Sequence, residues 1–110
     1  LDITYMPAMN AFMVLTGQSA GAAFVSSESA YMKKYFDYQV QTDATAVFRI
    51  ENKVFTLGNE LKVYLPSEDE LKLIKEYPEI SGTCWLKEGN VLAVANTQGL
   101  FLYDVTEPEY

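Results

Sequence analysis

The sequence contains no histidine and a single cysteine, Cys84, among its 110 residues. A serine nucleophile of the hydrolase type depends on a histidine base, and structural zinc sites depend on clustered cysteine and histidine. One cysteine also excludes a disulfide within the chain. No P-loop or dinucleotide-binding fingerprint is present. We therefore expect no catalytic, metal-binding or cofactor-binding residues, and we expect that the protein is not an enzyme.

Basic residues are also scarce. The chain has 8 Lys and Arg residues against 15 Asp and Glu residues, and its formal net charge is −7. Arg49 and the lysines form no patch, whereas binding to nucleic acid or to a membrane surface needs clustered basic side chains. No apolar run approaches the ~20 residues of a membrane span. We therefore expect a protein partner, no nucleic acid and no membrane insertion.

The hydrophobic share is ordinary, at 49%, and aromatic residues are abundant, at 14%. The hydrophobic share is typical of a globular domain, and the aromatic share favours strands. One cysteine and no signal-peptide pattern favour the cytoplasm. We expect residues 1–110 to form a single structural unit. Because the chain starts at Leu1 without methionine, we also expect it to be a processed or excised piece of a longer protein.

An internal repeat with a period of 39 residues runs through the sequence. The aligned columns are Val25, Tyr64 and Tyr103; Phe24, Val63 and Leu102; Ala22, Leu61 and Leu100; Gly21 and Gly99; and Tyr38 and Tyr77. These are apolar and turn positions, which a repeated structural unit must keep. We expect blade-like repeats at about 1–40, 41–79 and 80–110.

Each copy reads as short runs of β-branched and aromatic residues bounded by turn residues, which predicts antiparallel strands joined by tight turns. The predicted strands are 3–6, 11–16 and 22–25 in the first copy, 44–50, 54–58 and 61–65 in the second, and 82–86, 91–95 and 100–105 in the third. A fourth segment follows the third strand in two copies, at 31–38 and 71–77.

The last copy resembles a blade of WD-repeat and related β-propellers, because Tyr103-Asp104 ends its third strand where that family often has Trp-Asp. The family's Gly-His pair is absent, and the resemblance covers nearly the whole chain. It implies an all-β fold of two to three propeller-like four-stranded antiparallel blades. Repeat units need neighbours to bury their faces. The resemblance therefore also implies a larger propeller, a partner chain or a homo-oligomer.

Two segments leave a second fold open. Ser67 followed three residues later by Glu70 matches a helix capping box, and Leu71 and Ile74 follow at helical spacing. The segment that begins at Ser27 is also compatible with a helix. The alternative is therefore an α+β domain with an antiparallel sheet and two helices near 27–38 and 68–77.

The sequence Gly17-Gln18-Ser19-Ala20-Gly21 matches the G-x-S-x-G nucleophile elbow and resembles the serine segment of carboxylesterase-type α/β-hydrolases. Ser19 would be the acyl-transfer nucleophile. A serine hydroxyl needs a positioned histidine base in this motif, and the chain has none. We therefore interpret the segment as a hairpin turn, in which Gly21 matches Gly99.

Two further features receive structural interpretations. Cys84 lies between Thr83 and Trp85 in a predicted strand, and we expect a buried structural thiol without a cation to activate it. Glu68-Asp69-Glu70 lacks the ligand spacing of a calcium loop, and we expect a solvated turn or a helix start.

The repeat favours a protein–protein interaction scaffold whose loops at one end carry recognition. One alternative is a small lectin-like ligand-binding propeller, to which four aromatic residues could contribute: Tyr5, Trp85, Tyr64 and Tyr103. The other is a compact acidic α+β module with a regulatory or inhibitory role, which would engage a basic protein surface.

Overall fold

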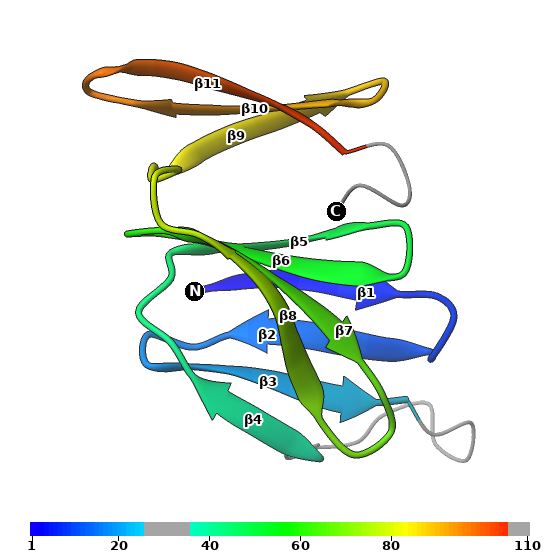
Figure 1. Cartoon of the computed structure of the whole chain (residues 1–110). Helices are drawn as coiled ribbons and strands as arrows, with labels where there is room; N and C mark the ends of the chain where they lie inside the picture. The colour runs from blue at the N-terminus through cyan, green and yellow to red at the C-terminus, as the bar shows by residue number, and fades with distance from the viewer. Residues whose placement is uncertain (26–35, 106–110) are drawn as a thin grey trace.

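A computed structural model describes residues 1–25 and 36–105, and within these ranges the chain is all-β with no helical residue. Its strands form three antiparallel sheets, each built from strands consecutive in sequence (Figure 1). The first sheet contains β1 (Asp2–Met6), β2 (Ala11–Leu15), β3 (Ser19–Phe24) and β4 (Tyr38–Gln41). The second contains β5 (Ala46–Ile50), β6 (Lys53–Leu57), β7 (Leu61–Pro66) and β8 (Leu71–Tyr77). The third contains β9 (Cys84–Glu88), β10 (Val91–Asn96) and β11 (Gly99–Asp104).

The all-β expectation is confirmed, and the helix proposed near 68–77 is wrong. Residues 71–77 form strand β8. The hydroxyl of Ser67 accepts hydrogen bonds from the amides of Asp69 and Glu70, at 3.3 and 3.2 Å, while the Ser67 amide donates to the Glu70 carbonyl at 2.9 Å. The Ser-x-x-Glu pattern therefore closes the turn between β7 and β8, because a serine side chain bonds to nearby amides in turns as readily as at helix starts.

The other proposed helix, near 27–38, and the predicted fourth strand of the first copy, 31–38, fall mostly on residues 26–35, which lie outside the described residues. Where the description resumes, Phe36 and Asp37 precede strand β4, which begins at Tyr38. The fourth strand of the first sheet therefore starts where the prediction placed its end.

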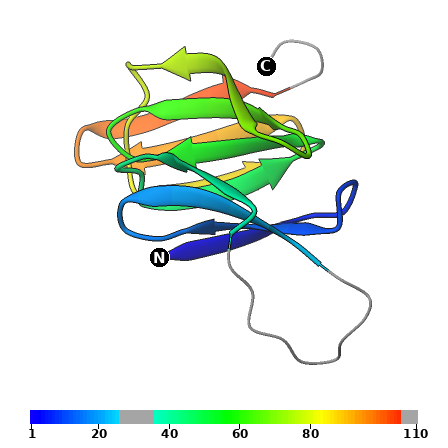
Figure 2. The same ribbon diagram turned by 90° about the horizontal axis from the view of Figure 1, so that it is seen from below.

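The three sheets stack face to face in chain order, with the second sheet in the middle (Figures 1 and 2). Between the first and second sheets, Met13 and Leu15 share a core with Val47 and Val54. Between the second and third, Phe55 and its neighbours share another core with β10. Strand β6 is consequently buried on both faces, and its residues from Val54 to Leu57 are an unbroken buried run rather than an alternating one.

Backbone geometry repeats from one sheet to the next. The amide of Thr42 donates to the Gln18 carbonyl at 3.0 Å, and 40 positions later the amide of Gly82 donates to the Gly58 carbonyl at 3.1 Å. The turn between the first two strands of each sheet also contains one residue with a left-handed backbone conformation. These residues are Asn10, Glu51 and Gly89, with φ of 48°, 56° and 59°. The repeat is therefore a property of the backbone as well as of the sequence.

The hairpin registers correct part of the sequence alignment. Leu61, Val63 and Tyr64 of β7 are equivalent to Leu100, Leu102 and Tyr103 of β11, as the 39-residue columns predict. In the first sheet, however, the equivalents are Ala20, Ala22 and Ala23, so the columns that contain Ala22, Phe24 and Val25 are displaced by two residues. The reason is the longer connection from the third strand to the fourth, since Ala22 and its β4 partner Tyr38 are 16 positions apart whereas Val63 and its β8 partner Lys75 are 12 positions apart.

Two further columns fail for the same reason of register. Gly21 lies within β3, whereas Gly99 opens β11 with a φ of 144°. Tyr38 begins its strand and Tyr77 ends its strand. Neither pair therefore occupies equivalent positions in the repeat.

We expect Thr56→Val to raise the free energy of unfolding by about 1–2 kcal/mol. Thr56 is 1% exposed in β6, and its hydroxyl has no hydrogen-bond partner. A buried hydroxyl without a partner costs about 1–3 kcal/mol, and valine fills nearly the same volume without that cost. Urea unfolding would measure the change. Thr45→Val is the control, because the Thr45 hydroxyl donates to the Leu57 carbonyl at 3.4 Å; a gain for Thr45→Val and none for Thr56→Val would contradict the prediction.

Candidate functional site

Turns from all three sheets gather at one end of the stack, where they form a polar groove. The groove has a volume of about 520 Å³ and is lined by the β6–β7 and β10–β11 turns together with the loops that precede β5 and β9. A second hollow of about 430 Å³ at the β2–β3 turn shares Asp43 with it. We call the two hollows together the turn-end groove, defined by residues 17–18, 41–43, 45, 58–59, 79, 81–83, 96–98 and 101.

Two glycines allow the turns that line this groove to approach each other closely. A methyl group at Gly58 would lie 2.9 Å from the Cα of Ala44, and one at Gly82 would lie 2.5 Å from the carbonyl oxygen of Ala95. Both distances are far below van der Waals contact. The hydrogen bond from the Gly82 amide to the Gly58 carbonyl joins the second and third sheets at this point. Only glycine permits this packing at both positions.

Side chains fix the loops of the groove. The Asn59 amide nitrogen donates to the Asp43 carboxylate at 2.9 Å, and the Asn96 amide nitrogen donates to the Ser81 carbonyl at 2.8 Å. The Gln98 backbone amide donates to the Asn96 side-chain oxygen at 2.8 Å, which shapes the β10–β11 turn. Such side-chain bonds to turn backbone order loops without secondary structure.

The groove is acidic and rich in hydrogen-bond acceptors. Its charged lining residues are Asp43 and Glu79, both exposed, and no Lys or Arg is found among the described residues that line it. Hydroxyl and amide side chains supply the rest of its polar surface. Because the described lining contains no Lys or Arg, the two carboxylates give the groove a negative potential that favours a donor-rich or basic ligand.

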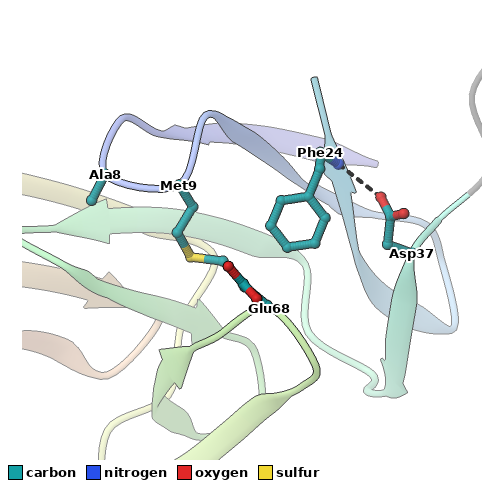
Figure 3. Close-up of a pocket in the computed structure, with 5 residues that line it drawn as sticks. All are labelled: Ala8, Met9, Phe24, Asp37 and Glu68. Carbon is teal, nitrogen blue, oxygen red and sulfur yellow. Dashed lines mark hydrogen bonds between the residues drawn. The ribbon is translucent and has the colours of Figure 1, made fainter. Parts of the chain in front are cut away.

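The opposite end of the stack carries a different hollow, of about 580 Å³, lined by Ala8, Met9, Phe24, Asp37 and Glu68 (Figure 3). The Asp37 carboxylate accepts a hydrogen bond from the Phe24 amide at 2.8 Å. Three of its five lining residues are apolar. Close by, the Tyr38 hydroxyl donates to the Ser67 carbonyl at 2.8 Å. Burial raises the pKa of the Tyr38 hydroxyl above its usual value.

Ser19 lies in the hairpin that the sequence predicts. It is the first residue of β3, directly after the turn that contains Gly17 and Gln18, and no helix follows it. Its hydroxyl donates to the Gln39 side-chain oxygen at 2.9 Å and lies 3.0 Å from the Thr16 hydroxyl. A nucleophile elbow is a strand-to-helix turn. The turn before Ser19 instead joins strand β2 to strand β3, and the hydrogen bonds of the Ser19 hydroxyl stabilise this hairpin.

Cys84 is exposed, so the expectation of a buried structural thiol is wrong. It begins β9, and all five residues of this strand are exposed. Strand β9 is an edge strand of the third sheet, and no described element covers the sheet face away from the second sheet. The sequence shows that the strand is hydrophobic enough for a core, but it does not show what covers it.

The four aromatic residues considered for a ligand pocket do not converge. Tyr5 packs on Phe12 on the outer face of the first sheet, with ring centroids 5.1 Å apart, whereas Tyr64 is 5% exposed between the first and second sheets. Trp85 stacks on Phe48, and the Tyr103 hydroxyl donates to the Tyr77 hydroxyl, both between the second and third sheets. Each of these residues joins a packing contact at a different level of the stack.

Sequence reasoning missed the turn-end groove. The usable signal was the recurrence of small polar residues at the second turn of each copy, Gly17-Gln18, Gly58-Asn59 and Thr97-Gln98. The sequence marked these as turns, but not as turns that meet. Their convergence depends on how the sheets stack, and local turn chemistry does not encode that.

Searches of protein-family models, curated proteins and solved structures found no match to this chain. Within residues 1–25 and 36–105, no group of three or more metal-ligating side chains lies together. No helix in that part of the chain is long and apolar enough to cross a membrane.

Proposed function

We propose that the chain is a protein–protein interaction scaffold built from β-propeller-like repeats, with blades at about 1–40, 41–79 and 80–110. The observation that carries this proposal is the repeated bond between a turn and the next loop, Thr42 to Gln18 and then Gly82 to Gly58. This bond recurs at the same place in successive sheets and brings the loops of all three to one end. A rigid stack of sheets that presents clustered loops is a common arrangement for recognition.

The groove chemistry favours a partner segment with basic side chains. Asp43 and Glu79 both line the turn-end groove, in the loops that precede β5 and β9. An Arg or Lys side chain that reached either carboxylate would form a charge-assisted hydrogen bond, stronger than a neutral one. The surrounding Asn, Gln, Ser and Thr side chains would satisfy the backbone of an extended segment.

A peptide-binding measurement tests this function. We expect fluorescein-labelled Arg- and Lys-containing peptides to bind more tightly than Glu-containing peptides of the same length, as measured by fluorescence anisotropy. The double variant Asp43→Asn/Glu79→Gln should weaken binding about two- to thirtyfold, because exposed charge pairs contribute about 0.2–1 kcal/mol each. Asparagine keeps an acceptor oxygen for Asn59, so the loop should hold its shape.

The matched control is Glu68→Gln, which removes one negative charge at the opposite end of the stack. This variant should bind the same peptides with unchanged affinity at physiological salt, because the Debye length there is about 8 Å. Equal losses in the groove variant and the control would indicate a general charge effect. No peptide binding by the unsubstituted chain at any composition would refute the proposed function.

A further inference from the structure

The outer face of the third sheet is apolar and uncovered in the described structure. In antiparallel sheets, directly opposite residues project to the same face. Leu86, Ala93 and Leu102 are opposite one another in β9, β10 and β11. Leu86 is 65% exposed and Leu102 is 69% exposed, while the alternating residues Val94 and Phe101 pack toward the second sheet. Contiguous exposed apolar rows of this kind mark interaction surfaces.

This outer row occupies the same repeat position as a row that is buried inside the molecule. Phe48, Phe55 and Val63 are opposite one another in the second sheet and stand at the equivalent register positions. They are between 0% and 2% exposed because the third sheet covers them. The outer face of the third sheet is therefore the repeat equivalent of the second-sheet face that the third sheet covers.

The first sheet has the complementary face at the other end of the stack, where the Phe36 ring lies over Gly21 but Ile3 and Tyr5 stay exposed. Ile3 and Val14 are opposite each other there, and so are Tyr5 and Phe12. Ile3 is 58% exposed. The repeat equivalent of Ile3 in the third sheet is Trp85, which stacks on Phe48 of the second sheet. Phe48 is the repeat equivalent of Leu86. The contact between Trp85 and Phe48 therefore shows how the position of Ile3 packs on the position of Leu86 when two successive sheets meet.

We propose that two copies of this chain dock head to tail, with the third sheet of each copy on the first sheet of the other. The proposal rests on the propeller-like repeat of the preceding subsection. Each chain supplies three sheets, and closed propellers have typically four to eight blades. Six is the only multiple of three in that range, so two chains complete one ring. Both outer faces are then buried by two equivalent contacts related by a twofold axis, and closure prevents open filaments.

Solution mass tests this assembly. Light scattering after gel filtration should give twice the chain mass of 12.4 kDa. Leu86→Lys and Ile3→Glu each place a charge in both contacts of the dimer, so each variant alone should elute as a monomer. Both positions are exposed in the single chain, which should let the variants fold. Leu73→Lys, at a 41% exposed position of the middle sheet, should remain dimeric.

Mixing the two charged variants distinguishes a head-to-tail ring from other dimers. In the mixed dimer one contact joins the two opposite charges and the other contact is unchanged, so the dimer mass should return. A dimer that pairs like faces would not be restored in this way. A mass of 12.4 kDa for the unsubstituted chain at all concentrations, a mass of three or more copies, or no restoration on mixing would overturn the proposal.

The two proposals fail separately. A monomer that still binds basic peptides in the turn-end groove would overturn the ring and leave the scaffold function in place. Further sheets of a longer polypeptide would then be the cover of the outer faces. A dimer that binds no peptide would overturn the function and leave the ring.

Discussion

Replacing Phe48 with alanine should lower the free energy of unfolding by about 3–5 kcal/mol, the usual cost of truncating a buried phenylalanine. Phe48 is 2% exposed, and its ring lies between two others. The ring centroids are 5.4 Å from Phe55 in the same sheet and 3.9 Å from Trp85 in the third sheet. The substitution therefore removes core volume and also breaks the aromatic contact that joins two sheets.

Trp85 is the only tryptophan in the chain, so its fluorescence reports on this contact directly. We expect its native emission to shift to longer wavelength in Phe48→Ala, alongside a lower urea midpoint at the same protein concentration. Leu73→Ala truncates a 41% exposed side chain and should cost less than about 1 kcal/mol with no change in emission. A loss below about 1.5 kcal/mol in Phe48→Ala, or unchanged emission, would show that the stacked rings do not join the sheets.

Gly82→Ala should cost about 1–3 kcal/mol, because its new methyl group would meet the backbone of β10 at the Ala95 carbonyl. Backbone cannot rotate away as a side chain can, so the loop that precedes β9 must move. We expect amide hydrogen exchange to accelerate in the third sheet more than in the first, since the substitution separates the third sheet from the second. Peptide binding in the turn-end groove should weaken in parallel, because Gly82 lines it.

Gly17→Ala is the matched control. Gly17 also lines the groove, but no heavy atom lies within 4 Å of a methyl group placed there. This variant should change stability by no more than about 0.5 kcal/mol. If both variants were equally stable, close approach at Gly82 would not be what holds the third sheet in place.

Local chemistry predicted the strands well. Nine predicted strands and the segment 71–77 coincide with observed strands to within a few residues at each end. The reason is that the residues between them favour turn conformations. It failed where one pattern serves two structures. The bond from the Glu70 amide to the Ser67 hydroxyl is common to a helix cap and to this hairpin turn, but here the Glu70 backbone carbonyl, not its side chain, accepts from the Ser67 amide. Register in the first copy also failed, since turn length changes the spacing of equivalent residues.

The candidate site was harder to predict than the fold. Cys84 was expected to be buried because its strand is apolar, yet burial depends on a neighbouring sheet that local sequence does not specify. The groove residues Asp43 and Glu79 are 36 positions apart and carry no shared motif. They come together only through stacking of the second and third sheets, which arises from side-chain packing between sheets.

The order of the strands has a consequence for how the chain reaches its native state. Every described strand pairs only with strands next to it in sequence, and apart from the β3–β4 connection, residues 25–37, the connections within each sheet have two to four residues. Local pairing costs little loop entropy and favours fast formation of individual hairpins. The slow, cooperative event is then the docking of finished sheets on one another, and the middle sheet, which gains a neighbour on each face, is the natural nucleus for that docking.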